Sequence, residues 1–295
     1  MRKLRKKESA ACLLFLLPSI LGVIVFVLAP FTDVCRRSFT AAVSGDFRGI
    51  DNYKQVFENK AFWLAAGNTA KFVLVCLPLL IGLGLLIAGF LSRFRRIHFL
   101  KSAFLFPMAV PAASVVLIWK LMFDRQGFLN LLLTRLGEAA YHAGIVQSAP
   151  VFHIDYMGTG AAFWVLVFSY IWKNLGYTVV LWLTGILSVS DRLREAARVD
   201  GAGEFTCFVR IIMPNLKPVL YTITVLSFLN TFKAFREAYL VAGSYPDESM
   251  YLLQHLFNNW FTNLDFDKMA AAAVIMGFIL FAAILLLQKL WDERE

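Results

Sequence analysis

The amino-acid sequence predicts an all-α, polytopic membrane protein with six transmembrane helices. The chain is 59% hydrophobic and only 17% charged, and its mean hydropathy of +0.65 is far above that of an ordinary soluble domain. Long stretches lack Asp, Glu, Lys and Arg altogether, namely residues 9–32, 72–92, 102–119 and 269–288. Each stretch approaches the roughly 20 apolar residues that are needed to cross about 30 Å of hydrocarbon.

Two further apolar stretches complete the set of spans. Residues 161–187 contain one charge, Lys173, and residues 218–243 contain charges only near their end. A helix satisfies its backbone hydrogen bonds internally, as the bilayer requires. The sequence therefore predicts spans at about 11–31, 70–92, 102–122, 161–187, 218–243 and 269–290.

The order of the spans predicts a simple domain organisation and an orientation. We expect an amino-terminal part (1–69), a core transmembrane domain (70–290) that includes a polar loop (188–217), and a tail (291–295). Lys and Arg are dense before the first span, after the second, and in the polar loop, which predicts cytoplasmic amino and carboxyl termini. The basic residues behind the net charge of +9 lie beside the span ends, where they attract anionic lipid headgroups. This placement argues against nucleic-acid binding.

The sequence lacks the patterns of metal centres and catalytic sites. Its four cysteines and its four histidines are dispersed, without the spacing of metal ligands or of a disulfide framework. No Gly-x-x-x-x-Gly-Lys-Ser/Thr loop occurs, so the chain has no phosphate-binding loop for ATP. Neither a Ser-His pair nor paired carboxylates occur at catalytic spacing. We therefore expect no enzyme activity, metal or cofactor in this chain.

The polar loop between the fourth and fifth spans has the pattern of two helices joined by a turn. From Asp191 to Asp200 the residues favour a short helix with an apolar face, and Asp200-Gly201 predicts the turn that ends it. A second one-sided apolar stripe follows until Pro214 stops the helix. The stripe consists of Phe205, Phe208, Val209 and Ile212. We call residues 188–217 the elbow.

The elbow resembles the EAA loop of the permease subunits of ATP-binding-cassette importers. The resemblance is carried by Glu195, Ala196, Ala197, Asp200, Gly201, Ala202, Phe208, Ile211 and Pro214. It departs from the family pattern at Met213, where Leu is usual, and at Ser190, where Pro is common. The resemblance implies a type I importer fold, in which these residues couple the permease to a cytoplasmic ATPase. Phe205, Phe208 and Ile212 would then anchor the elbow against its own spans or against the ATPase. Glu195 would face either a basic group of the ATPase or its own Arg198.

The remainder of the chain is similar to permeases for carbohydrate uptake. The shared pieces include Leu17-Pro18, Asn52-Tyr53, Asn68-Thr69, Phe106-Pro107 and Trp172-Lys173. The resemblance implies import of a sugar across a bacterial-type cell membrane. It also implies a second homologous permease, two ATPase subunits that bind ATP and Mg²⁺, and an extracytoplasmic substrate-binding protein. The segment from Gly243 to Ser249 departs from the family's Gly-Gly-Pro signature, which leaves the identity of the sugar open.

Polar and aromatic residues within the fourth and fifth spans are candidates for the substrate path. A charge inside a span costs about 2.5–3.5 kcal/mol on insertion scales, so each needs a partner or a cavity. The candidate residues are Trp172, Lys173, Asn174, Tyr177, Asn230, Lys233, Phe235 and Tyr239. The alternative for Lys173 is a structural contact to a neighbouring helix, and the alternative for Lys233 is a pair with Glu237.

A second class of function uses the same charges differently. An ion- or proton-coupled secondary transporter would employ Lys173, Lys233, Arg236 and Glu237 as a relay. Such transporters commonly contain internal repeats and helices broken at the midplane of the membrane. Neither feature is predicted from this sequence. A coupled ATPase is therefore the favoured energy source.

Overall fold

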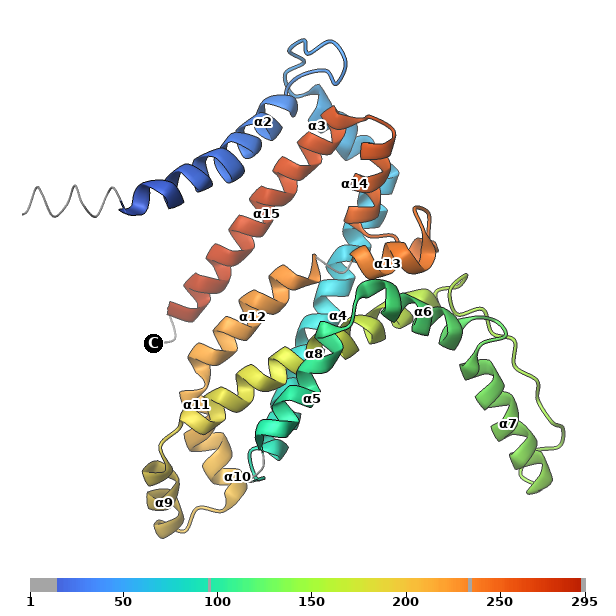
Figure 1. Cartoon of the computed structure of the whole chain (residues 1–295), viewed down its shortest axis with the longest axis vertical. Coiled ribbons are helices and arrows are strands. Elements are labelled where there is room, and N and C mark those ends of the chain that lie inside the picture. Colours follow the sequence, from blue (N-terminus) through green and yellow to red (C-terminus); the bar gives the residue numbers. More distant parts are fainter. Residues whose placement is uncertain (1–14, 95–96, 233–234, 293–295) are drawn as a thin grey trace, which may run out of the picture. The chain divides into compact units, whose positions relative to one another are not determined.

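The computed structural model describes residues 15–94, 97–232 and 235–292, and their regular structure is helical (Figure 1). Besides the helices, these residues contain an isolated antiparallel bridge between Thr40 and Phe47. The all-α class is thus confirmed. The chain forms two compact units, one made of residues up to Phe62 together with those from Phe257, and one made of Trp63–Leu256. The division into residues 1–69, 70–290 and 291–295 remains a prediction.

Four helices of the described chain are long and apolar enough to cross a membrane. They are Phe15–Arg37, Lys60–Leu91 (α4), Ala161–Ser188 (α8) and the segment Phe266–Trp291 of α15 (Phe266–Asp292). The count rises to six if each of two bent helix pairs is one span. The predicted spans at 11–31, 70–92, 161–187 and 269–290 coincide with the four straight helices, although α4 begins ten residues earlier than predicted.

The predicted span at 102–122 is not one helix. It consists of α5 (Ile97–Ala109) and α6 (Ala112–Phe123). The helical segments on the two sides of the break, Lys101–Ala109 and Ala113–His142, are bent by 90°. Two prolines explain the break. Pro107 removes a backbone donor inside α5, and Pro111 disfavours helical geometry at the residue before it.

The predicted span at 218–243 is also divided. Its parts are α12 (Lys217–Thr231) and α13 (Phe235–Ala242). The side-chain amide of Gln254 donates to the carbonyl of Phe232, one of the backbone groups that the end of α12 leaves without a helical partner. The expectation that no span is broken was therefore wrong for both of these helices.

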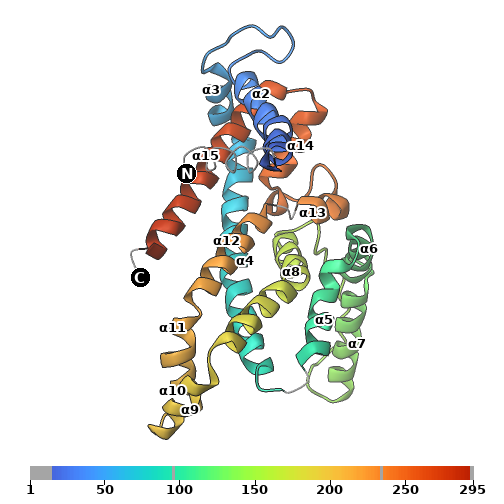
Figure 2. The same cartoon turned by 60° about the vertical axis from the view of Figure 1, so that its left-hand side comes forward.

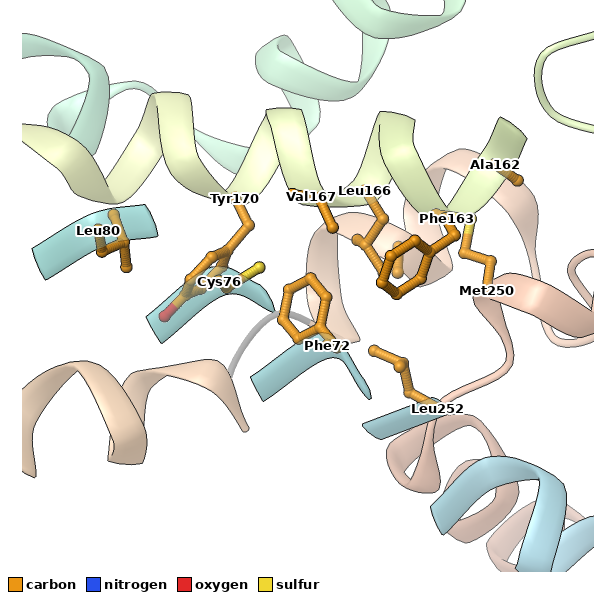
Figure 3. Packing of buried hydrophobic residues seen from close by; sticks show 11 residues of the cluster. Phe72, Cys76, Leu80, Ala162, Phe163, Leu166, Val167, Tyr170, Met250 and Leu252 are labelled. Carbon is orange, nitrogen blue, oxygen red and sulfur yellow. The ribbon is translucent and has the colours of Figure 1, made fainter. Parts of the chain in front are cut away.

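Helix α8 is the centre of the second unit. It packs against α5 and α12, and Figure 3 shows its first half packed on α4. This first cluster contains buried side chains from α4, α8, α13 and the chain after α13, namely Phe72, Cys76, Leu80, Ala162, Phe163, Leu166, Val167, Tyr170, Ala238, Met250 and Leu252. A second cluster joins the end of α4 to the second half of α8 and to the elbow, and includes Trp182, Ile186, Ile212 and Leu216.

Glycines allow the helices of this unit to approach closely. A Cβ atom at Gly176 of α8 would lie 1.8 Å from the carbonyl oxygen of Phe104 on α5. A Cβ atom at Gly185 would lie 2.8 Å from the side chain of Val219 on α12. The backbone of α8 therefore sits directly against two neighbouring helices, which leaves α8 little freedom to move alone.

The connections predicted to lie outside the membrane are held by the side chains of three asparagines, of which Asn52 and Asn130 are buried. In the first unit, Asn52 of α3 (Asp51–Glu58) donates to the carbonyls of Ser38 and Thr40. In the second unit, Asn68 donates to the carbonyls of Glu248 and Tyr251. Asn130, in α7 (Phe128–His142), likewise bonds to backbone groups at both ends of its loop. These side chains satisfy backbone groups that irregular chain would otherwise leave unpaired.

Helix α7 lies in the connection before the fourth span, where Phe128, Leu129, Leu132, Leu133 and Leu136 recur at the spacing of an amphipathic helix. Its residues Phe128, Leu132 and Leu136 are exposed apolar side chains. The connection after α13 contains η3 (Glu248–Met250) and α14 (Leu253–Thr262).

Candidate functional site

The first helix of the elbow ends where the sequence predicts. It is α9 (Asp191–Val199), and Gly201 follows with φ +80°, a conformation that L side chains rarely adopt. The amide of Ala202 donates to the carbonyl of Ala197, and the amide of Gly201 donates to that of Arg198. This pair of bonds is a Schellman motif, which satisfies the last carbonyls of the helix and reverses the chain.

The second arm of the elbow is less regular than predicted. It comprises α10 (Glu204–Cys207), the π-helical turn η2 (Phe208–Ile212) and α11 (Met213–Asn215). Pro214 lacks the N–H that an α-helix would use, and a π turn immediately before it accommodates that gap. The first span shows the same arrangement, with η1 (Ile24–Leu28) before Pro30 in α2 (Ala29–Arg37). The arm ends at Asn215, one residue beyond the predicted stop, and α12 continues at a bend of 66°.

The elbow lies at one end of the second unit, beyond the last turn of α8 and the first turn of α12 (Figure 2). Of the residues that carry the family resemblance, only Ala197 is buried. The half-buried ones are Ala202, Phe208 and Ile211, and the exposed ones are Glu195, Ala196, Asp200, Gly201 and Pro214. Most of this motif is therefore accessible to another molecule.

The charges of the elbow pair across the turn rather than along α9. Arg198 forms an ion pair with Glu204, with 2.8 Å between Nη2 and Oε1. The local pair between Glu195 and Arg198 is not formed. Within the described part of the chain, the structure gives the exposed carboxylate of Glu195 no ion-pair partner.

The apolar stripe of the second arm divides between two roles. Phe208 and Ile212 pack into the second cluster, and the Phe208 ring lies beside Gly89 of α4. Phe205 is 81% exposed, and Val199 on the first arm is 87% exposed. Two of the three predicted anchors thus hold the elbow to its own spans, while Phe205 points to no partner within the second unit.

A polar contact joins α8 to α12 eleven residues before the end of α8. The Tyr177 hydroxyl lies 2.6 Å from the Ser227 hydroxyl, and the side chain of Asn230 also interacts with Tyr177. The Tyr170 hydroxyl donates to the carbonyl of Ser227. Asn174, between the two tyrosines, donates to the carbonyl of Tyr170 in its own helix. The structure therefore brings together Tyr177 and Asn230, two of the predicted path residues.

The other described path residues are distributed over α8 and α13. Trp172 packs edge-on against Trp119 of α6, with ring centroids 5.4 Å apart. Lys173 is half-buried, and Tyr239 lies on α13. Arg236 is exposed. Lys233 and the side chains of Phe235 and Glu237 lie outside the described residues, and so does the predicted Lys233–Glu237 pair.

Sequence reasoning missed three residues that position the site. Ser227 is an ordinary residue in an apolar helix, and no sequence pattern marks it. The guanidinium of Arg194 donates to the carbonyl of Ile186 near the end of α8. Asn68 was noticed only as part of the family resemblance. The polar pair Asn68-Thr69 near the start of a span could have indicated that these side chains hold a loop, here the one at Glu248. The described residues contain no cluster of His, Cys, Asp or Glu that could hold a metal ion.

Comparison with known proteins identifies the family. Residues 80–294 match the family described as "Binding-protein-dependent transport system inner membrane component". The chain belongs to this family. It is 29% identical over 285 residues to the trehalose/maltose transport system permease protein MalF of Thermococcus litoralis, covering 94% of this chain and 92% of that one. It is 30% identical over 294 residues to the arabinooligosaccharides transport system permease protein AraP of Bacillus subtilis, covering 96% and 88%.

The fold agrees with this membership. The structure superposes on a chain of a bacterial ABC transporter involved in the import of the acidic polysaccharide alginate, with a TM-score of 0.83 and 18% identity over 99% of both chains. The chain thus has the importer permease fold and is a transport subunit of the inner membrane rather than an enzyme. Membership also disfavours the secondary transporter, even though two of the spans are broken as in that class.

Proposed function

We propose that this chain is one of two permease subunits of an ATP-driven sugar importer. The observation that supports this most strongly is the exposure of the elbow motif at the end of the spans. The chain that carries this motif belongs to a family of binding-protein-dependent transport components. In this proposal an extracytoplasmic binding protein delivers the sugar, and two ATPase subunits supply the energy by binding ATP and Mg²⁺. Both termini and the elbow are cytoplasmic.

The proposed ATPase contact consists of the exposed parts of the elbow. Phe205 and Val199 provide apolar side chains that protrude from the two arms, and Glu195 provides a carboxylate. An ATPase cleft that buries the Phe205 ring and offers a basic group to Glu195 would match this surface, since central aromatic anchors dominate interface energies. Phe208 and Ile212 then carry the force into the spans, because a packed element moves as a rigid body.

A sugar is the proposed substrate class. Two relatives that align with more than nine-tenths of this chain are named after sugars. One is named for trehalose and maltose, and the other for arabinooligosaccharides. Tyr177, Ser227 and Asn230 form a polar contact between α8 and α12. Hydroxyl and amide groups exchange hydrogen bonds with sugar hydroxyls. We place the sugar path along these residues, together with Asn174 and Lys173 one turn earlier on α8.

Reconstitution tests the proposal. The chain would be placed in proteoliposomes with the second permease, the ATPase and the binding protein of the proposed importer. We expect uptake of a labelled malto- or arabino-oligosaccharide that requires ATP inside and the binding protein outside. Phe205→Ala should reduce uptake and ATP hydrolysis together, whereas Val43→Ala, a change at a side chain 99% exposed in the outer connection, should reduce neither. Uptake that is driven by a proton gradient without the ATPase would refute the proposal.

A further inference from the structure

We propose that Arg194 is a positioning residue that makes the elbow and α8 move together. The inference rests on the proposed coupling function and adds to it the side chain that transmits movement from the first arm. It starts from the contact between the Arg194 guanidinium and the carbonyl oxygen of Ile186. Arg194 is in the first half of α9, and Ile186 is in the last turn of α8.

The contact satisfies the end of α8 chemically. The last carbonyls of a helix have no partner within the helix, and they carry the negative end of its dipole. The Ser188 hydroxyl donates to the carbonyl of Gly185, and Arg194 donates to that of Ile186. A permanent cation at this place is favourable both as a hydrogen-bond donor and as a charge. The elbow itself therefore caps the helix that precedes it.

Little else attaches the first arm to the spans. Ala197 is the one residue of α9 that is buried, and Leu193 is 48% exposed. The Arg194 side chain, in contrast, is half-buried, and its Nε atom is inaccessible and has no hydrogen-bond partner among the described residues. The methyl group of Ala197 and the guanidinium of Arg194 thus hold α9, and its other side chains are exposed.

The second arm is attached independently. Phe208 packs beside Gly89 of α4, and Ile212 and Leu216 belong to the second cluster. Leu216 and Val219 also lie against Gly185, one residue before the carbonyl that Arg194 contacts. Both ends of the elbow therefore meet the last turn of α8. Val189, which precedes α9, also belongs to the second cluster, so without Arg194 the helix α9 would be held only by Val189 and Ala197.

Helix α8 leads from this attachment to the proposed sugar path. Ile186 and Tyr177 are nine residues apart, which is about 14 Å along a helix at 1.5 Å per residue. At Gly176 the backbone of α8 lies against the carbonyl of Phe104 in α5. A displacement of α9 that pulls on Ile186 would thus shift Tyr177 and α5 together. Loss of the Arg194 contact would let α9 move while α8 stays in place.

The experiment compares three variants in the reconstituted transporter. Arg194→Met keeps an unbranched apolar stem and removes the charge and the donors, Arg194→Lys keeps a positive charge with donors at one nitrogen, and Arg192→Met alters an exposed arginine of the same helix. The measured quantity is sugar imported per ATP hydrolysed. We expect Arg194→Met to lower this ratio by roughly ten-fold, as the loss of one charge-assisted hydrogen bond predicts. Arg194→Lys should recover part of the loss, and Arg192→Met should equal the wild type.

A second measurement separates loose coupling from poor folding. Nitroxide labels at Leu187→Cys and Val199→Cys, in a background without the native cysteines, report the distance between α8 and the end of α9. Both positions are exposed. The distance distribution should broaden in Arg194→Met while thermal stability of the solubilised protein stays near that of Arg192→Met. An unchanged distribution, or an unchanged ratio of sugar to ATP, would overturn the inference.

The outcomes also separate this inference from the proposed function. If Gly201→Val, which distorts the turn itself, leaves ATP-driven uptake normal, the coupling role of the whole elbow fails. If Gly201→Val abolishes uptake while Arg194→Met transports with the normal ratio, only the role of Arg194 fails.

Discussion

The hydroxyl groups of Tyr177 on α8 and Ser227 on α12 lie 2.6 Å apart. Both helices are otherwise apolar over most of their length, and both reach the elbow at their cytoplasmic ends in the proposed orientation. A hydroxyl pair inside a span must be satisfied, because no water replaces a lost partner there. The pair therefore links the two helices on either side of the elbow at a place where a sugar hydroxyl can compete for the same hydrogen bonds.

Replacement of Tyr177 by Phe tests this contact. The variant keeps the ring and removes the hydroxyl, so we expect the KM for sugar uptake to rise roughly three- to ten-fold, which corresponds to one neutral hydrogen bond. Uptake at increasing sugar concentration measures the change. Tyr245→Phe is the matched control, since Tyr245 is 75% exposed in an outer connection. An equal KM in the two variants would remove Tyr177 from the path.

The turn of the elbow is tested by two substitutions at Gly201. A Cβ atom there meets no atom within 4 Å, so a side chain is opposed only by the φ of +80°. Valine in this conformation costs about 1–2 kcal/mol and should redirect the second arm, whereas asparagine tolerates it. We expect Gly201→Val to abolish ATP-driven uptake with normal membrane insertion, and Gly201→Asn to retain most of it. Equal uptake by both variants would show that the turn geometry is irrelevant to transport.

Close helix packing predicts opposite results for two glycines. Gly176→Ala forces a methyl group to within 1.8 Å of the Phe104 carbonyl oxygen, whereas the same change at Gly82 of α4 meets nothing within 4 Å. Overpacking costs about 1–3 kcal/mol, and a clash with backbone lies at the top of that range. Thermal unfolding in detergent should therefore show a marked loss of stability for Gly176→Ala and little change for Gly82→Ala. Similar melting temperatures would place α5 farther from α8 than described.

Stability should fall in mild acid because of His255 in α14. Burial lowers the pKa of His255 from 6.5 to about 4, so the folded state keeps the ring neutral. The contribution of the neutral His255 ring to the free energy of unfolding is complete above pH 6.5. It is lost as the pH falls toward 4, at about 1.4 kcal/mol per pH unit within that window. The ring Nδ1 accepts a hydrogen bond from the amide of Leu252, which the oxygen of Asn can also do.

The melting temperature of His255→Asn should consequently depend less on pH than that of the wild type. Melting curves at pH 7.5 and pH 5 measure the difference. A wild-type protein that loses no more stability than the variant between these two values would contradict the assignment.

The elbow was predictable in detail because its signals are local. The end of α9, the glycine turn and the exposed motif each depend on residues within one or two helical turns, where capping and turn chemistry act. The ion pair of Arg198 was not predictable in the same way. Its partner Glu204 is brought close only by the reversal at Gly201, so the i,i+3 rule suggested Glu195 instead.

The broken spans show where apolar composition misleads. Residues 102–122 are apolar enough to be one helix, and Pro107 and Pro111 were visible but outweighed by that composition. Proline chemistry acts on backbone geometry and leaves hydropathy unchanged. The contacts of Ser227 and Arg194 depend on which helices become neighbours, which no single sequence pattern encodes.

The length of α4 has a consequence for work with this protein in different lipids. Its 32 residues extend for about 48 Å at 1.5 Å per residue, whereas the hydrocarbon layer is roughly 30 Å thick. Its charge-free part, residues 72–91, is about 30 Å long and matches that layer, whereas Lys60 and Lys71 lie on the part that extends beyond it. We therefore expect reconstituted activity to be highest in lipids of intermediate acyl-chain length, because a thicker bilayer would draw Lys71 into hydrocarbon.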